Sequence, residues 1–380
     1  MTVQDHTAPV AFSREDMQAQ LDTILAHARH VRIDWDRLAE VAALAGPSIA
    51  SDWQAAYRGQ DEHYGEPIGV ELSPEDLLQF AFIRDSQGWL IWERTPDGHP
   101  IPLTMRVEGQ TYVGGWAPDA CHMRALHEGQ DVLDADTIAA FSMADVELHY
   151  RDEATGTVKA QLLEERLINF REAGQVLRDE FGGHFKNVLR RADGWLYRPD
   201  GQGLMQLLVT RFPNCFGDWP MAKLPNVLIL NLLDRRALRS FGAEIDRLLD
   251  FHDLDRLVGG ADYYRPWFFL RVGILEISDE LKQTLRRCTQ IVPGSAMELE
   301  YRAATIVVMR ELGSRLGEWP TTLSAVATET HAQPFLRCRR CRVGITDEEL
   351  PCPYRAVCKA THEDHELMAC MWPLVLTSEY

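Results

Sequence analysis

Helix start and stop signals recur along most of this chain, and they constrain its fold more than any other feature. Ser73-Pro74-Glu75 supplies an N-cap, a first-turn proline and an acidic first turn, and Ser295-Ala-Met-Glu298 is a capping box. Gly182-Gly183 follows a long run with helical periodicity. These signals predict a mainly α fold, with helices over residues 117–128, 162–181, 203–212, 224–241 and 295–315.

One stretch changes to the short period of strands. Trp89 to Glu93, Pro102 to Val107 and Gln110 to Gly114 are runs rich in aromatic and branched residues, and turn sequences separate them. We therefore expect a small antiparallel β-sheet near residues 89–115 within an otherwise helical body.

A break in composition follows Pro334, where the helical periodicity is lost and cysteine and arginine become frequent. The pattern predicts three segments. They are N-terminal helices and a loop over residues 1–70, a helical body with the small sheet over 71–333, and a cysteine-rich, metal-binding appendix over 334–380.

The charge balance limits the partners of the chain. Acidic residues number 57 against 39 basic ones, so the net charge is −18 and we expect no bulk binding to nucleic acid on electrostatic grounds. No apolar run approaches the roughly 18 to 20 residues of a membrane-spanning helix. No basic stretch followed by an apolar run precedes Glu15, so we expect no secretory signal, no membrane association and a cytoplasmic protein.

Four cysteines near the C-terminus have the spacing C-x2-C-x10-C-x5-C; they are Cys338, Cys341, Cys352 and Cys358. Thiolates this close in sequence can converge on one centre, which leaves zinc and a [4Fe-4S] cluster as alternatives. The Cys-Pro-x4-Cys ending resembles the four-iron loop of endonuclease III-type DNA glycosylases. Four thiols without a metal are the simpler interpretation. His362, His365 and Cys370 are possible substitute ligands.

An ordered set of short segments carries a resemblance to a known family. They are Gly109-Gln-Thr-Tyr112, Gly115-Trp116, Arg124-Ala-Leu126, Leu163-Glu-Glu-Arg166, Phe181-Gly-Gly183, Phe212-Pro213, Ala261-Asp262-Tyr263 and Gly294-Ser295. In this order and spacing, from about residue 20 to 340, the chain resembles the queuosine salvage proteins. The resemblance implies a helical body akin to DNA glycosylases. It also implies an N-glycosidase that hydrolyses the bond between ribose and the 7-deazaguanine base of queuosine 5′-phosphate and releases queuine.

The resemblance assigns the catalytic role to Asp262, which matches the aspartate of the family's Phe-Ala-Asp-Tyr-Arg segment. Cleavage of an N-glycosidic bond passes through an oxocarbenium-like sugar. A fixed carboxylate near C1′ can therefore stabilise the developing positive charge and accept a proton from the attacking water. No cofactor is required for this hydrolysis. An isolated aspartate at a helix start is also a common N-cap, which is the structural alternative for Asp262.

Seven further residues are candidates for substrate binding: Phe80, Phe82, Trp116, Asp218, Tyr263, Arg265 and Arg302. The aromatic side chains could stack on a deazapurine ring, although core packing is the expected role of at least one of them. Glu165, Arg166 and Glu300, together with Arg302, could instead form a buried ion network.

The chain departs from the family at several positions. Pro225 to Ile229 replaces a segment in which members carry lysine and arginine, and Tyr264 replaces an arginine next to Arg265. These changes leave two alternatives open. One is a glycosylase acting on a modified base in single-stranded nucleic acid, helped by Arg337, Arg339, Arg340 and Arg342. The other is an inactive protein that binds modified nucleosides.

Overall fold

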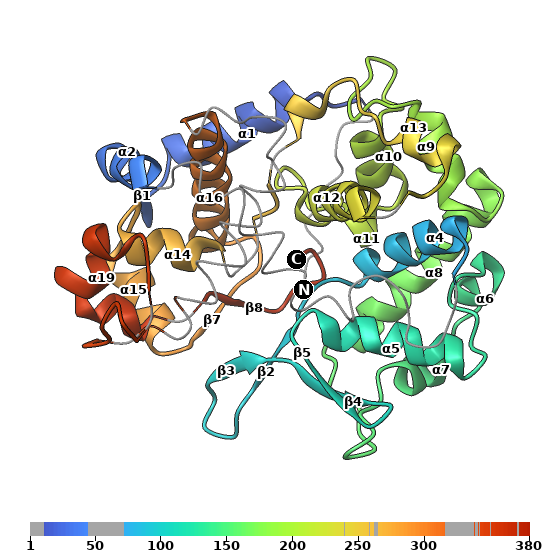
Figure 1. Cartoon of the computed structure of the whole chain (residues 1–380), viewed down its shortest axis with the longest axis horizontal. Helices are drawn as coiled ribbons and strands as arrows, with labels where there is room; N and C mark the ends of the chain where they lie inside the picture. The colour runs from blue at the N-terminus through green and yellow to red at the C-terminus, as the bar shows by residue number, and fades with distance from the viewer. Residues whose placement is uncertain are drawn as a thin grey trace. The chain divides into compact units, whose positions relative to one another are not determined.

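A computed structural model describes residues 11–44, 72–238, 240–257, 259–261, 265–315, 338, 341, 343–349, 351–370 and 372–380 of the chain (Figure 1). Contacts divide it into two compact units. Unit 1 comprises Met1–Arg14, Asp61–Arg256 and Thr377–Tyr380, and unit 2 comprises Glu15–Gln60 and Leu257–Leu376. The two units are defined by contacts in the structure, whereas the three predicted segments were defined by the composition of the sequence, so the two divisions are not equivalent.

Unit 1 is built mainly from helices. They are α4 (Pro74–Ser86), α5 (Trp116–His127), α6 (Ala135–Ala139), α7 (Met143–His149), α8 (Leu163–Phe181), α9 (Phe185–Ala192), α10 (Leu204–Arg211), α11 (Pro213–Phe216), α12 (Lys223–Leu238) and α13 (Ala243–Leu248), followed by a 3-10 turn, Leu254–Arg256. Helix α4 begins as predicted, because the Ser73 side chain accepts a hydrogen bond from the Asp76 amide. Helix α8 ends at Gly182, whose φ of 58° lies in the left-handed region that glycine tolerates.

The predicted sheet is present but divided in two. Strands β2 (Trp92–Arg94) and β3 (Pro100–Pro102) form one antiparallel pair, and β4 (Thr104–Val107) and β5 (Gln110–Val113) form another. Proline lacks an amide hydrogen, and Pro102 is where the first ladder ends. Leu103 still links the pairs, since its amide donates to the Ile91 carbonyl and its carbonyl accepts from the Gly114 amide.

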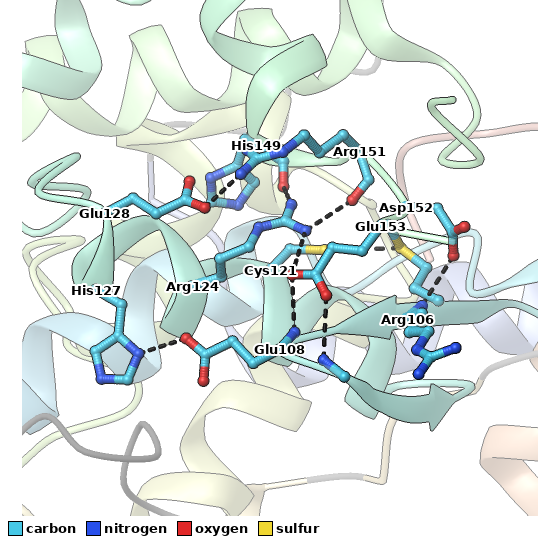
Figure 2. Close-up of polar contacts among 12 residues, drawn as sticks. Arg106, Glu108, Cys121, Arg124, His127, Glu128, His149, Arg151, Asp152 and Glu153 are labelled. Carbon is cyan, nitrogen blue, oxygen red and sulfur yellow. Dashed lines mark hydrogen bonds and ion pairs between the residues drawn. The ribbon is translucent and has the colours of Figure 1, made fainter. Parts of the chain in front are cut away.

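A network of polar groups, in which Arg124 and Asp152 are buried, links the second hairpin to α5 (Figure 2). The Arg124 guanidinium, 2% exposed, donates to the carbonyls of His149 and Arg151, both at 2.8 Å. The Glu153 carboxylate accepts from the Glu108 amide at 2.8 Å, and Asp152 accepts from the Arg106 amide at 2.8 Å. Arg124, one of the residues that carry the family resemblance, therefore has a structural role here.

Two adjacent histidines lie in the core of unit 1. The rings of His122 and His149 are 4.7 Å apart between centroids, and both side chains are about 1% exposed. Neither ring nitrogen of His122 has a hydrogen-bond partner among the described residues. Burial, with smaller effects of the Arg84 and Arg166 charges, lowers the pKa of His122 to about 3. This imidazole is therefore neutral at physiological pH.

Unit 2 contains nearly all of α1 (Arg14–Ala26), together with α2 (Trp35–Leu44), α14 (Arg265–Val272), α15 (Asp279–Arg286), α16 (Ala296–Arg315) and α19 (Lys359–His362), with 3-10 turns at Arg355–Val357 and His365–Ala369. Strand β1 (Val31–Ile33) pairs antiparallel with β6 (Leu275–Ile277), and β7 (Gln290–Ile291) pairs parallel with β8 (Leu374–Val375). The Glu300 carboxylate accepts from the amides of Arg29, His30 and Val31, so it holds the entry to β1 rather than joining an ion network.

The prediction of a mainly helical fold is confirmed, and most predicted helices agree with the structure to within a few residues. The loop predicted over residues 45–70 lies outside the described residues, as do the four arginines between 337 and 342. Within the described part of the chain, no helix has both the length and the apolar character needed to cross a membrane.

Candidate active site

The proposed catalytic segment joins Gly260 to α14. Asp262 and Tyr263 lie outside the described residues, and so does the side chain of Arg265. Ala261 is fully buried, and α14 begins at Arg265.

An ion pair on α16 fixes the backbone directly before Asp262. Arg302 and Glu298 are one helical turn apart, each about 3% exposed, and their Nη1 and Oε1 atoms are 3.1 Å apart. The Arg302 Nε donates to the Ala261 carbonyl at 3.3 Å, and the Glu298 carboxylate also accepts from the Gly294 amide at 3.0 Å. Arg302, a predicted substrate contact, therefore supports the backbone of the candidate catalytic segment.

Unit 1 contains a second buried charged cluster, which the sequence analysis missed. Asp85, 2% exposed, lies at the end of α4 and accepts two hydrogen bonds from the Asn231 amide group of α12, at 3.0 and 3.1 Å. The Arg84 guanidinium bridges Asp85 at 2.9 Å and Asp119 of α5 at 2.7 Å. Burial raises the pKa of Asp85 despite the attraction of Arg84. Perturbed carboxylates of this kind often mark functional sites.

The start of α12 brings two more charged groups into the interior of unit 1. The Asp218 carboxylate, 3% exposed, accepts from the Lys223 amide at 2.9 Å. The Lys223 ammonium is also buried and donates to the Gly88 carbonyl at 3.1 Å. Residues 225–229 contain no lysine, but Lys223 lies on the same helix only two residues earlier. The sequence signal for Lys223 was a single lysine directly before a mainly apolar stretch.

The aromatic candidates occupy different environments. Phe82 is fully buried and stacks on Phe185 with 4.6 Å between ring centroids, and Phe212 and Phe216 cover it further. Phe82 therefore belongs to the core, the role expected for at least one of these residues. Phe80 is 4% exposed and meets His122 edge-on. Trp116, at the first turn of α5, is only half-buried.

Arg166, the other arginine considered for an ion network, is fully buried among backbone carbonyls. It donates to Gln87, Trp89 and Gln161, and its guanidinium lies 4.0 Å from the centre of the Trp89 ring. This arrangement joins the start of α8 to the end of α4 through hydrogen bonds and a cation–π contact. It makes Arg166 a structural residue of unit 1.

The four clustered cysteines line one cavity in unit 2, together with Phe268, Arg271, Val272, Tyr354, Arg355, Thr361 and Met368. The possible substitute ligands are not among the lining residues. His362 and His365 contact backbone carbonyls at 2.8 and 3.1 Å, and Cys370 is buried elsewhere. No group of three or more His, Cys, Asp or Glu side chains within the described ranges is arranged to hold a metal ion.

Three other cysteines are buried in the interior of the two units. Cys121 and Cys215 are fully buried in unit 1, and Cys288 is 8% exposed in unit 2. Burial raises the pKa of the Cys121 thiol to about 12, so it is not a nucleophile at neutral pH.

Two helical units with carboxylates held in buried charged clusters define a mainly α protein with interior polar sites. Comparison with known proteins identifies its family. The family model described as queuosine salvage protein matches residues 70–327, and the chain belongs to this family.

Individual relatives extend over most of the chain. A mouse protein named queuosine 5′-phosphate N-glycosylase/hydrolase is 26% identical over 326 residues, which cover 83% of this chain and 90% of the relative. A protein of the same name from Sphaerobacter thermophilus is 28% identical over 307 residues, covering 80% and 86%. Another from Nematostella vectensis is 25% identical over 301 residues, covering 76% and 79%.

Proposed function

We propose that this chain is an N-glycosidase that hydrolyses the bond between ribose and base in a 7-deazaguanine nucleotide of the queuosine 5′-phosphate type. The released base then enters salvage. The match over residues 70–327 carries the proposal, because it spans the Asp262 segment and the helices that support it. The names of the relatives support the same reaction and the same class of small-molecule substrate.

We assign the catalytic carboxylate to Asp262. As the bond from C1′ to the base nitrogen breaks, its electron pair leaves with the base and the sugar gains positive charge, which a carboxylate beside C1′ stabilises. Water then attacks C1′ and Asp262 accepts its proton, which passes to solvent, while the nitrogen of the departing base takes up a proton from solvent. The hydrogen bond from Arg302 to the Ala261 carbonyl supports this role, since it fixes the residue directly before the carboxylate.

The substrate contacts follow from the same assignment. Phe80 and Trp116 stay predictions as stacking residues and Asp218 as a polar contact, and so do Tyr263 and Arg265, which are near Asp262 in the sequence. We also propose Lys223 as the positive charge that binds the 5′-phosphate. Its ammonium is buried, and it lies in the sequence just before the segment in which family members carry a lysine. Arg302 acts as a positioning residue.

The proposed partner is thus a small nucleotide rather than a polynucleotide, which agrees with the net charge of −18. We propose a cytoplasmic location, in line with the sequence analysis. The DNA-glycosylase-like character of the helical body is part of the same proposal.

The test is incubation of the full chain with three substrates: queuosine 5′-phosphate, queuosine, and a single-stranded oligonucleotide containing queuosine. Chromatography measures the free base. We expect release from the nucleotide at a rate well above that from the oligonucleotide. Release only from the oligonucleotide would favour a nucleic-acid glycosylase. Tight binding of the nucleotide without any release would show an inactive binding protein. Either result would refute the proposal.

A further inference from the structure

Four cysteines from separate positions of the C-terminal segment meet at one cavity against α14. They are Cys338, Cys341, Cys352 and Cys358, and the cavity that they line is called here the cysteine cavity. Closeness in the sequence alone does not explain this grouping. Cys370 lies only twelve residues after Cys358, yet it does not line the cavity.

Besides the four cysteines, two arginines and Thr361, the residues that line the cysteine cavity are apolar or aromatic. Phe268, Val272, Tyr354 and Met368 supply most of the remaining surface. Soft sulfur ligands select zinc or iron–sulfur centres.

The arrangement discriminates between these two centres. A tetrahedral zinc site holds each sulfur about 2.3 Å from one ion, so its four sulfurs must be nearly in contact with one another. No described group of three or more potential ligands has an arrangement that suits one ion, yet all four cysteines face the same space. A [4Fe-4S] cluster gives each cysteine its own iron at one corner, and it therefore suits ligands spread around a larger volume.

Arg271 supplies a second observation at the cysteine cavity. This residue of α14 is only 3% exposed, and its guanidinium lies 4.2 Å from the centre of the Trp267 ring. It donates to the carbonyls of Cys338 and Met368, while its Nε has no hydrogen-bond partner in the described part of the chain. The Cys358 thiol donates to the Arg271 carbonyl at 3.5 Å.

The buried Arg271 guanidinium lies at the same cavity as the four sulfurs, so its positive charge can balance the negative charge of a cluster. A [4Fe-4S] centre with four thiolate ligands carries net negative charge in its common oxidation states, and nearby donors to its ligands stabilise it. Among the described residues that line the cysteine cavity there is no carboxylate that could compete for Arg271.

We propose that the four cysteines of the cysteine cavity ligate a [4Fe-4S] cluster with a structural role. The cluster joins the C-terminal segment to α14, whose first residue is three positions after Asp262. The hydrolytic reaction does not pass through it, so its presence and the proposed function can be tested separately.

The experiment uses the full chain, purified without oxygen and reconstituted with ferrous iron and sulfide. Iron, zinc and acid-labile sulfide are measured per chain, with the visible spectrum. We expect roughly four iron and four sulfide per chain and a brown colour. Cys352→Ser should lose most of the iron. The matched control, Cys370→Ser, removes a buried cysteine outside the cavity and should keep it.

Two results would overturn the proposal. One is a colourless wild-type chain with less than one iron after reconstitution. The other is a single zinc ion per wild-type chain that resists exchange for iron. Both are measured on the wild-type protein first, so a variant that fails to fold does not affect the decision. Base release from queuosine 5′-phosphate, assayed on the same samples, reports on the proposed function independently.

Discussion

Replacing Arg302 with methionine separates two roles that this residue could have. The substitution keeps a long unbranched side chain but removes the donor to the Ala261 carbonyl and leaves Glu298 without its ion-pair partner. Both charged side chains are about 3% exposed. Removing one partner of such a buried pair costs about 3–5 kcal/mol, because the remaining carboxylate has lost its compensating charge.

The same substitution should slow the reaction. Without Arg302, no guanidinium holds the residue that precedes Asp262. A displacement of about 1 Å at a catalytic group can reduce the rate about 100-fold. We therefore expect kcat to fall by about two orders of magnitude with little change in KM. A direct contact between Arg302 and the substrate phosphate would mainly raise KM instead.

A double variant distinguishes positioning from simple loss of stability. Glu298→Gln added to Arg302→Met removes the unpaired charge but keeps an acceptor for the Gly294 amide. Urea unfolding should show recovery of much of the lost free energy, while kcat should stay low because the Ala261 carbonyl still lacks its donor. Full recovery of kcat in the double variant, or wild-type stability in the single one, would refute this reasoning.

Three further substitutions or conditions test other parts of the structure. The pKa of His122 is lower in the folded than in the unfolded chain, so its contribution to stability is present above about pH 6.5 and is lost as the pH falls toward 3. Unfolding at pH 7 and 4.5 should differ by about 2–3 kcal/mol from this residue alone, and His122→Leu should reduce that difference. Gly174→Ala should destabilise unit 1 by about 1–3 kcal/mol in urea unfolding, because the added Cβ would lie 2.5 Å from the Ala135 carbonyl. An unchanged urea midpoint would contradict this prediction, because it would mean that α6 shifts to accommodate the added Cβ at no cost in stability. Lys223→Met should raise KM for queuosine 5′-phosphate at least about 10-fold and leave KM for the unphosphorylated nucleoside nearly unchanged; equal changes for both would exclude a phosphate contact.

Local signals explain which parts of the fold the sequence could predict. Ser73 caps α4 through its own side chain, and Gly182 ends α8 with a positive φ, so neither depends on distant residues. The pairing of β1 with β6 joins segments more than 240 positions apart and has no such local signal. Helices α6 and α7 did have caps, at Asp134 and Ser142, but their shortness gives too few periodic positions for a prediction.

The candidate site was predictable only in part. The resemblance locates Asp262 because its flanking residues form a recognisable segment. Asp85 has no such context, since its importance comes from burial and from contacts with Asn231, which is 146 residues away. The cysteine spacing predicted convergence, which the structure shows, but the contribution of Arg271 depends on how α14 packs against the C-terminal segment.

The most direct test of the account is the turnover of queuosine 5′-phosphate by Asp262→Asn. Asparagine has nearly the same shape but can neither balance the charge of the sugar nor accept a proton from water. We expect base release to fall by about 10²–10⁴-fold while equilibrium binding of the nucleotide persists. Asp279→Asn, at the exposed start of α15, is the matched control and should keep wild-type turnover. Base release by Asp262→Asn at the wild-type rate would contradict the assignment of this carboxylate as the catalytic group.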